Sequence, residues 1–183
     1  MATHRSTTEL EAGLEQIRRS PRSVGTVELI VRRPAVDERE VIAEGELRID
    51  TGLVGDSWLE RGSTRTADGA AHPDMQLNVM NARVIALLAP EPHRWALAGD
   101  QLYVDLDLSE ANLPAGTRLR LGSVVIEVTA EPHRGCAKFA ARFGPDALRF
   151  VNSDVGRQLR LRGLNAKVVQ PGRLHRGDAI ARL

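Results

Sequence analysis

The sequence predicts a mostly β protein with helical decorations, an α+β chain built around a β-barrel. Short runs rich in β-branched residues recur along the chain, as at residues 24–31 and 40–49, and turn-prone residues separate them. Helical periodicity is confined to a few stretches between these runs. The 183 residues, 42% hydrophobic and 27% charged, are typical of one globular domain. We expect residues 1–21 to form an N-terminal helical arm and residues 22–183 to form the barrel domain.

The arm is predicted to be an amphipathic helix over residues 6–19. Leu10, Leu14 and Ile17 lie on one face of such a helix, although Gly13 weakens it. After the two strands named above comes a long glycine-containing loop of the kind that often carries function. The loop is expected to span residues 52–74. After it we expect strand 75–79, a helix that Asn81 caps and that ends at Ala89, and strand 102–104.

The clearest local signal lies in residues 117–128. Two alternating runs flank Gly122-Ser123, which predicts a two-residue hairpin with glycine at the first turn position. Beyond it we expect, in order, helix 136–143, helix 145–161 with a break near 152–154, strand 166–169 and strand 179–183.

Charge is distributed unevenly along the chain. There are 25 Lys and Arg against 24 Asp and Glu in total, whereas residues 131–183 hold 11 against 4. Two interpretations stay open: a solvated basic face, or a pocket for an anionic small-molecule ligand. Nucleic acid is not an expected partner, because the basic region lacks the interleaved aromatic residues of a stacking surface.

The lengths of the apolar runs and the number of cysteines indicate the cellular compartment of the protein. The longest apolar runs, near residues 84–90 and 124–128, are far shorter than the roughly 18 residues of a membrane span. The first residues carry no apolar signal core, and a single cysteine excludes an intrachain disulfide framework. We therefore expect a cytoplasmic protein with no membrane partner.

Cys136 is the strongest candidate for chemistry. It follows His133-Arg134-Gly135 at the predicted start of a helix, where backbone N–H groups favour a thiolate. His133 could carry a proton for it. The structural alternatives stay open as well: Cys136 shares an apolar stripe with Phe139, and His133 could simply bond to the backbone. The scattered histidines form no i, i+4 pair typical of a zinc site.

Several motifs, in this order, resemble the MOSC domain, the C-terminal domain of molybdenum-cofactor sulfurases. They are Gly52-Leu53-Val54-Gly55-Asp56, Thr117-Arg118-Leu119-Arg120-Leu121-Gly122, Glu127-Val128-Thr129, His133-Arg134-Gly135-Cys136-Ala137-Lys138-Phe139, and the closing segment 172–180. The last two are similar to those of the short, stand-alone bacterial branch. The resemblance covers roughly residues 22–183, and it implies a closed barrel and a molybdenum-pterin cofactor.

The resemblance also implies roles for individual residues. The family's cysteine is thought to carry sulfur to the cofactor or to ligate molybdenum, which makes Cys136, with His133, the expected catalytic group. The expected cofactor-binding residues are Arg134, Lys138, Arg142, Asp100, Gln101, Arg65 and His72, the last two from a loop that would act as a lid. One departure is that Asp100-Gln101 stands where many members have Glu-Asn, so each side chain differs in length by one methylene and the ligand contacts of this loop are open to question.

Three functions follow as expectations. The protein binds the molybdenum cofactor or carries sulfur for it through Cys136. Alternatively, it is a molybdenum-dependent reductase of N-hydroxylated compounds with Cys136 as the metal ligand, or a partner-binding barrel in which the cysteine is inert. A chain of this size lacks the pyridoxal-phosphate desulfurase domain of the fused sulfurases. Pyridoxal phosphate would therefore act only through a partner, a cysteine desulfurase, and a molybdoenzyme is the other expected partner.

Overall fold

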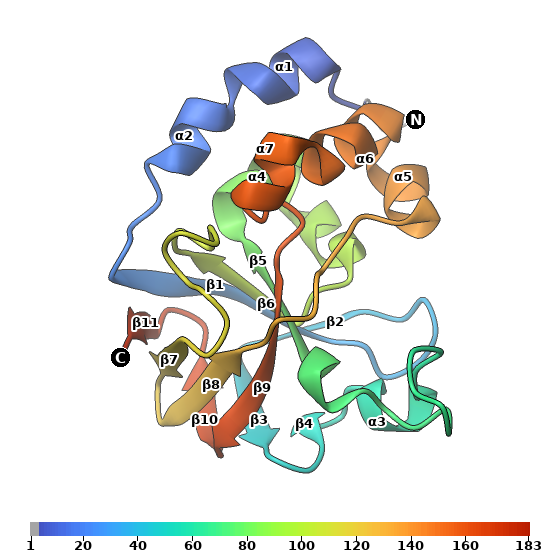
Figure 1. The fold of residues 1–183 in the computed structure, drawn as a ribbon, viewed down its shortest axis with the longest axis vertical. Helices are drawn as coiled ribbons and strands as arrows, with labels where there is room; N and C mark the ends of the chain where they lie inside the picture. Colours follow the sequence, from blue (N-terminus) through green and yellow to red (C-terminus); the bar gives the residue numbers. More distant parts are fainter. Residues whose placement is uncertain (1–3) are drawn as a thin grey trace.

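A closed ring of seven strands forms the centre of the molecule in the computed structural model, which describes residues 4–183 (Figure 1). Around the ring the order is β1-β11-β7-β8-β9-β5-β6, and β6 returns to β1. The strands are β1 (Val24–Arg32), β5 (Leu77–Asn81), β6 (Leu102–Asp105), β7 (Arg118–Leu121), β8 (Val124–Val128), β9 (Leu164–Gln170) and β11 (Ala179–Arg182). Strand β5 runs parallel to β6, and the other neighbours are antiparallel. The expected β-barrel is confirmed.

Side-chain alternation fills the barrel with aliphatic residues. In β7, Leu119 and Leu121 are fully buried while Arg118 and Arg120 are exposed, as the two-residue period of a strand requires. The β7–β8 turn is the predicted hairpin, with Gly122 at φ +55°. The interior is thus a packed core, and any ligand site has to lie at its mouth or outside it.

A second, smaller sheet packs below the barrel and corrects two expectations. Its strands are β10 (Gly172–His175), β3 (Glu44–Arg48) and β4 (Gly52–Leu53). Residues 40–49 were expected to be one strand, but β2 (Glu40–Ile42) pairs with β1 and β3 pairs with β10. The segment that forms β10 was expected to be only a connection between strands. Its partner β3 lies more than 100 residues earlier in the chain, so the sequence around β10 carries no local signal of this pairing.

Helices cover the upper end of the barrel in Figure 1. They are α1 (Thr7–Ala12), α2 (Leu14–Arg18), α4 (Ala82–Leu88), α5 (Ala137–Phe143), α6 (Pro145–Asn152), α7 (Asp154–Gln158) and the 3-10 helix η2 (Pro92–Ala98); α3 (Trp58–Arg61) and η1 (Pro73–Met75) lie in the long loop. A second core joins these upper helices to the outer face of the barrel, where Met80 and Tyr103 are fully buried. Leu10 and Ile17 of the predicted arm are buried in this same core.

Most predicted helix boundaries are confirmed, and the differences have local causes. The helix expected over 6–19 is interrupted at Gly13, and the expected break near 152–154 falls at Ser153, which caps α7. Asn81 caps α4 by accepting a hydrogen bond from the N–H of Arg83. Cys136, the expected first residue of α5, instead occupies the N-cap position before the helix, and its side chain makes no capping hydrogen bond. No helix within residues 4–183 is long and apolar enough to cross a membrane.

Candidate functional site

Asp100 lies at the centre of a buried hydrogen-bonded triad with Arg162 and His133. Its carboxylate accepts hydrogen bonds from Nη1 of Arg162 at 2.7 and 2.9 Å, and it lies 2.9 Å from Nε2 of His133. Arg162 also donates to the carbonyl of Ala98, and its guanidinium lies over the ring of Phe139. A carboxylate taken out of water in this way is stable only because it is paired and hydrogen-bonded.

The triad also sets the protonation of its members. Burial alone would raise the pKa of Asp100, but the charge of Arg162 and the bond to His133 lower it below its ordinary value. Burial and the charge of Arg162 lower the pKa of His133. The His133 ring is therefore neutral at pH 7, and a neutral ring that bonds Asp100 through Nε2 carries its proton there. Its Nδ1 is left as an acceptor.

A second buried ion pair holds the mouth of the barrel together. The guanidinium of Arg33 donates to both oxygens of Asp56 at 2.8 Å, and it also bonds the side chain of Asn78 and the carbonyl of Gly99. Asp56 additionally accepts the backbone N–H of Trp58. Strand β1, the long loop, β5 and the Gly99 turn are thus joined at one point.

Gln101 lies between the Asp100 triad and the buried Arg33–Asp56 pair. Its Oε1 accepts the N–H of Asn78 at 2.8 Å, and its Nε2 donates to the carbonyl of Gln76 at 3.2 Å. Gln101 and Asp100 are both completely buried, and their polar atoms are bound within the protein. The structure therefore places these two predicted cofactor-binding residues behind the site, where they position its walls.

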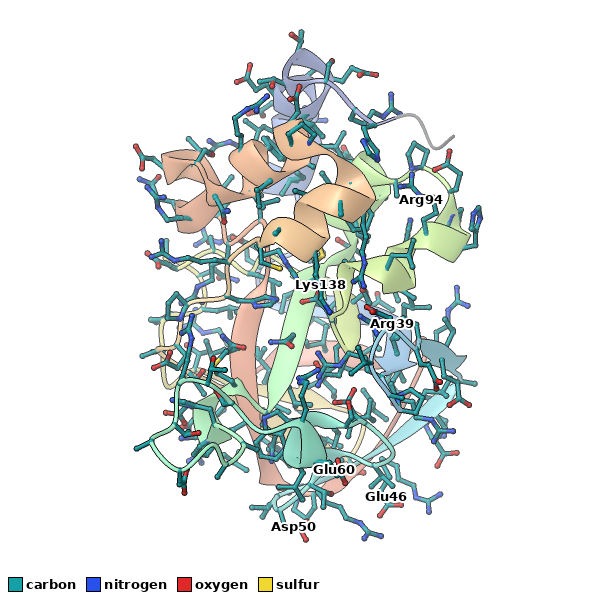
Figure 2. All side chains as sticks on the ribbon, turned by 90° about the vertical axis from the view of Figure 1, so that its right-hand side faces the viewer. Arg39, Glu46, Asp50, Glu60, Arg94 and Lys138 are labelled. Carbon is teal, nitrogen blue, oxygen red and sulfur yellow. The ribbon has the colours of Figure 1, made fainter. Side chains whose placement is uncertain are left out.

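Four arginines lie close together next to this network, and Asp56 and Asp37 match only part of their positive charge. We call the four residues concerned the arginine cluster: Arg33, Arg39, Arg61 and Arg142. Burial and the nearby charges of Arg142 and Arg33 lower the pKa of Arg39, and burial followed by Arg33 does the same for Arg61. Within residues 4–183, Arg39 has no carboxylate at ion-pair distance, and its buried Nε has no hydrogen-bond partner. Figure 2 shows Arg39 and Lys138 on one face, between the upper helices and Glu60 below.

A recess of about 720 Å³ opens beside the arginine cluster and is lined mainly by the long loop. Its basic lining residues are Arg61, Arg65 and His72. The loop is tied down on its far side, because Thr129 donates to the carbonyl of Asp74 at 2.6 Å and Arg65 pairs with Glu131 at 3.1 Å. The predicted residues Arg65 and His72 therefore share one recess, and the loop contacts the segment that leads to Cys136.

Cys136 is exposed at the start of α5, and the residue before it is clamped. Asn152 of α6 accepts the N–H of Gly135 at 3.0 Å and donates to its carbonyl at 3.1 Å. A Cβ at position 135 would lie only 2.8 Å from a methyl of Leu148, so glycine is what lets this segment lie flat on α6. The position of the thiol is fixed by α6 as well as by its own helix.

The other predicted basic residues, Arg134, Lys138 and Arg142, differ in whether their side chains have partners. Lys138 and Arg142 both reach Asp37, at 3.7 and 2.9 Å, and Arg142 also donates to the carbonyl of Leu97. Arg134 is exposed and, within the described chain, has no ion-pair or hydrogen-bond partner. The expectation that all three hold one anion is therefore not what the geometry favours, because two of them are already engaged with an acid.

Four important arginines were not singled out from the sequence: Arg33, Arg39, Arg61 and Arg162. Nothing in their local sequence separates them from the other arginines of an arginine-rich chain. Their burial and their shared location distinguish them, and both are tertiary properties. In the part of the chain that the structure describes, no group of three His, Cys, Asp or Glu residues is arranged to hold a metal ion.

The fold and the site together define a barrel protein with a cationic cleft and an exposed thiol. A model of the MOSC domain family matches residues 69–181, and the chain therefore belongs to the MOSC domain family. It is similar to the crystal structure of the YuaD protein from Bacillus subtilis, with a TM-score of 0.59 and 18% identity over 86% of this chain and 94% of that one. It is also similar to YiiM from Escherichia coli, with a TM-score of 0.56 and 20% identity over 86% and 69%. No curated protein matches the chain.

Proposed function

We propose that this protein binds the molybdenum-pterin cofactor in the cleft formed by the arginine cluster and the recess, and that Cys136 exchanges sulfur with it or ligates its metal. The family is associated with this cofactor, which supports the proposal. The observation that carries it is Arg39. Its guanidinium is half-buried, its Nε has no hydrogen-bond partner and no carboxylate lies at ion-pair distance within residues 4–183, while burial and the charges of Arg142 and Arg33 lower its pKa. An anion would balance this group, and the cofactor carries a phosphate.

The residues present fit such a ligand in size and in donor type. The recess, at about 720 Å³, is within the usual range for organic ligands. The chain offers one thiol, Cys136, and soft sulfur is a suitable single protein donor to a metal that the pterin already holds. In this proposal the protein holds the cofactor mainly by its organic part.

The roles of the chain's own residues follow from their positions. Within the arginine cluster, Arg39 and Arg61 bind and orient the phosphate, while Arg33 and Arg142, paired with Asp56 and Asp37, keep the cluster rigid. Neutral His133, held by Asp100, offers Nδ1 as a proton acceptor. When bound, the cofactor supplies the redox and sulfur-exchange chemistry of molybdenum.

The exposure of Cys136 suits transfer from another protein. In that step its thiolate attacks the outer sulfur of a persulfide on a partner cysteine desulfurase. A new S–S bond forms on Cys136 as the partner's own S–S bond breaks and the partner leaves as a thiolate. Cys136 would then hold the persulfide, and the cofactor of a molybdoenzyme, or cofactor held in the cleft, would be the acceptor of its sulfur.

The test is to purify the protein from a cofactor-producing host and to measure molybdenum, pterin and the mass of Cys136 peptides. We expect bound pterin and molybdenum in the wild type, with a large loss in Arg39→Gln. The matched control is Arg120→Gln, an exposed arginine on the far surface of β7, which should retain both. An additional sulfur on Cys136 indicates the carrier role, and molybdenum with reduction of N-hydroxylated compounds indicates the reductase. Absence of pterin from every sample would overturn the proposal.

A further inference from the structure

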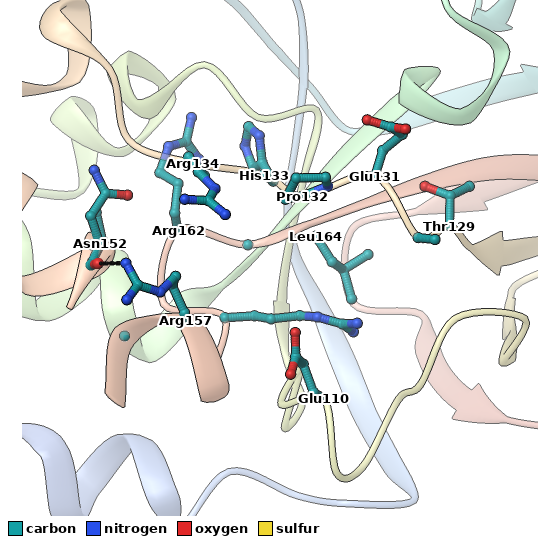
Figure 3. Close-up of a pocket in the computed structure, with 15 residues that line it drawn as sticks. Glu110, Thr129, Glu131, Pro132, His133, Arg134, Asn152, Arg157, Arg162 and Leu164 are labelled. Carbon is teal, nitrogen blue, oxygen red and sulfur yellow. Dashed lines mark hydrogen bonds between the residues drawn. The ribbon is translucent and has the colours of Figure 1, made fainter. Parts of the chain in front are cut away.

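A second, smaller cavity lies apart from the cofactor cleft. Its volume is about 110 Å³, and it shares no lining residue with the recess of the long loop. Its walls are the 129–134 segment, the chain around α7 and the residue Glu110. Figure 3 shows His133 and Arg134 above the opening and Glu110 below it. Several waters or one small ion fit in such a volume, whereas a macromolecule does not.

The charges around this cavity are matched one to one, with a single exception. Four arginines line it: Arg134, Arg157, Arg160 and Arg162. Arg157 pairs with Asp154, and Arg162 pairs with Asp100. Glu131 of the lining pairs with Arg65 at 3.1 Å, and Glu110 lies near Arg160. Each acidic residue around the cavity therefore has an arginine beside it, and Arg134 is the lining arginine with no acidic partner within residues 4–183.

Buried hydrogen-bond donors add to the unpaired positive charge of Arg134. Arg162 is 7% exposed, and its Nε has no hydrogen-bond partner within residues 4–183. Arg160 adopts φ +48° and donates to the carbonyl of Leu113 at 2.6 Å, so its stem is fixed along the cavity wall. A left-handed conformation is uncommon for arginine and is retained where the surroundings impose it. Fixed guanidinium groups around a small space favour an anion that accepts several hydrogen bonds.

We propose that this cavity binds a small tetrahedral oxyanion, such as sulfate or phosphate, with Arg134 as its principal ligand. A bound oxyanion offsets the unmatched charge of Arg134, accepts hydrogen bonds from the fixed guanidinium groups and replaces the water that they would otherwise hold. The site is independent of the cofactor cleft, since it uses other arginines and another opening. It adjoins that cleft through His133, which lines the cavity and bonds Asp100, and through Glu131, which lines the cavity and pairs with Arg65 of the recess.

The experiment measures sulfate binding by titration calorimetry, at constant ionic strength, to the full chain carrying Arg39→Gln. That background removes the main anion contact of the cofactor cleft. We expect saturable binding, and we expect Arg134→Gln on this background to weaken it about tenfold, because one charge-assisted contact is lost. The matched control, Arg149→Gln, removes an exposed arginine of the adjacent α6 that does not line the cavity. It should leave the affinity unchanged.

Two results would overturn the proposal. One is the absence of saturable sulfate binding in the Arg39→Gln background, which would assign anion binding to the cleft. The other is an equal affinity in the Arg134→Gln and Arg149→Gln proteins. Neither result bears on cofactor binding, which is measured separately by the pterin and molybdenum content of the wild type. Phosphate in place of sulfate should give the same ranking of variants.

Discussion

Gly163 and His133 approach each other so closely that a methyl group at position 163 would lie 3.3 Å from Cδ2 of the imidazole. The same methyl would lie 2.3 Å from the carbonyl oxygen of Val79. Gly163 has φ +105°, a backbone conformation that other residues adopt only with strain. The turn before β9 therefore supports the histidine ring directly.

Replacement of this glycine should be costly. We expect Gly163→Ala to lower the free energy of unfolding by about 2–4 kcal/mol, because strain and overlap with Val79 add together. Gly116→Ala is the matched control: its φ is +88° with no atom within 4 Å of the added methyl, so strain alone should cost about 1–2 kcal/mol. Urea unfolding of both variants measures the difference, and equal losses would contradict the proposed close approach.

Removal of the Asp100 charge should leave Arg162 buried and unpaired. We expect Asp100→Asn to destabilise the protein by about 3–5 kcal/mol. The double variant Asp100→Asn with Arg162→Met should recover part of the loss. The control Asp154→Asn removes an acid whose side chain is 88% exposed and should cost less than about 1 kcal/mol. Thermal or urea denaturation distinguishes these cases, and a double variant weaker than Asp100→Asn alone would argue against the pairing.

The neutral state of His133 predicts a pH dependence. Its pKa in the folded protein lies below 6.5, mainly because of burial, so the unfolded chain takes up a proton first as the pH falls. This contribution to stability is complete above pH 6.5 and is lost as the pH falls from there toward the folded pKa. His133→Asn should therefore reduce the slope of stability against pH in that range. NMR titration of the ring gives a direct measurement, and a midpoint above 6.5 would show that the prediction is wrong.

The clamp on Gly135 predicts a link between α6 and the thiol. Asn152→Ala removes two hydrogen bonds and should cost about 1–3 kcal/mol of stability. It should also change the rate at which iodoacetamide alkylates Cys136, because the segment before the thiol becomes free to move. Gln158→Ala, an exposed substitution in α7, serves as the control for both measurements. An unchanged alkylation rate in the Asn152 variant would mean that α5 alone positions the cysteine.

Local chemistry made many elements predictable from the sequence. The Gly122-Ser123 hairpin, the Asn81 cap and the helix break at Ser153 each depend on one or two residues and their neighbours. Strand β10 and the division of residues 40–49 were missed because they depend on pairing between distant segments. A strand pattern shows that a segment is extended, but it does not show which partner it finds.

Only part of the candidate site stood out in the sequence. The thiol and its histidine were singled out because their residue types are reactive, whereas Arg39 looks in sequence like any surface arginine. Its unusual feature is partial burial among other arginines, which only the folded chain creates. For the same reason Lys138 and Arg142 were expected to bind the cofactor, and their contact with Asp37, which lies 101 and 105 residues away in sequence, was not foreseen.

The pairing of Val24 with Ala181 has a consequence for biosynthesis. The ring cannot close on the ribosome until residues 179–181 have left the exit tunnel, and β1, more than 140 residues earlier in the chain, leaves it long before them. During that interval the β1 edge is an open template, and contacts of such long sequence separation form slowly. Nascent chains stalled before β11 should therefore be the species that chaperones hold and proteases remove, whereas full-length chains released from the ribosome escape both.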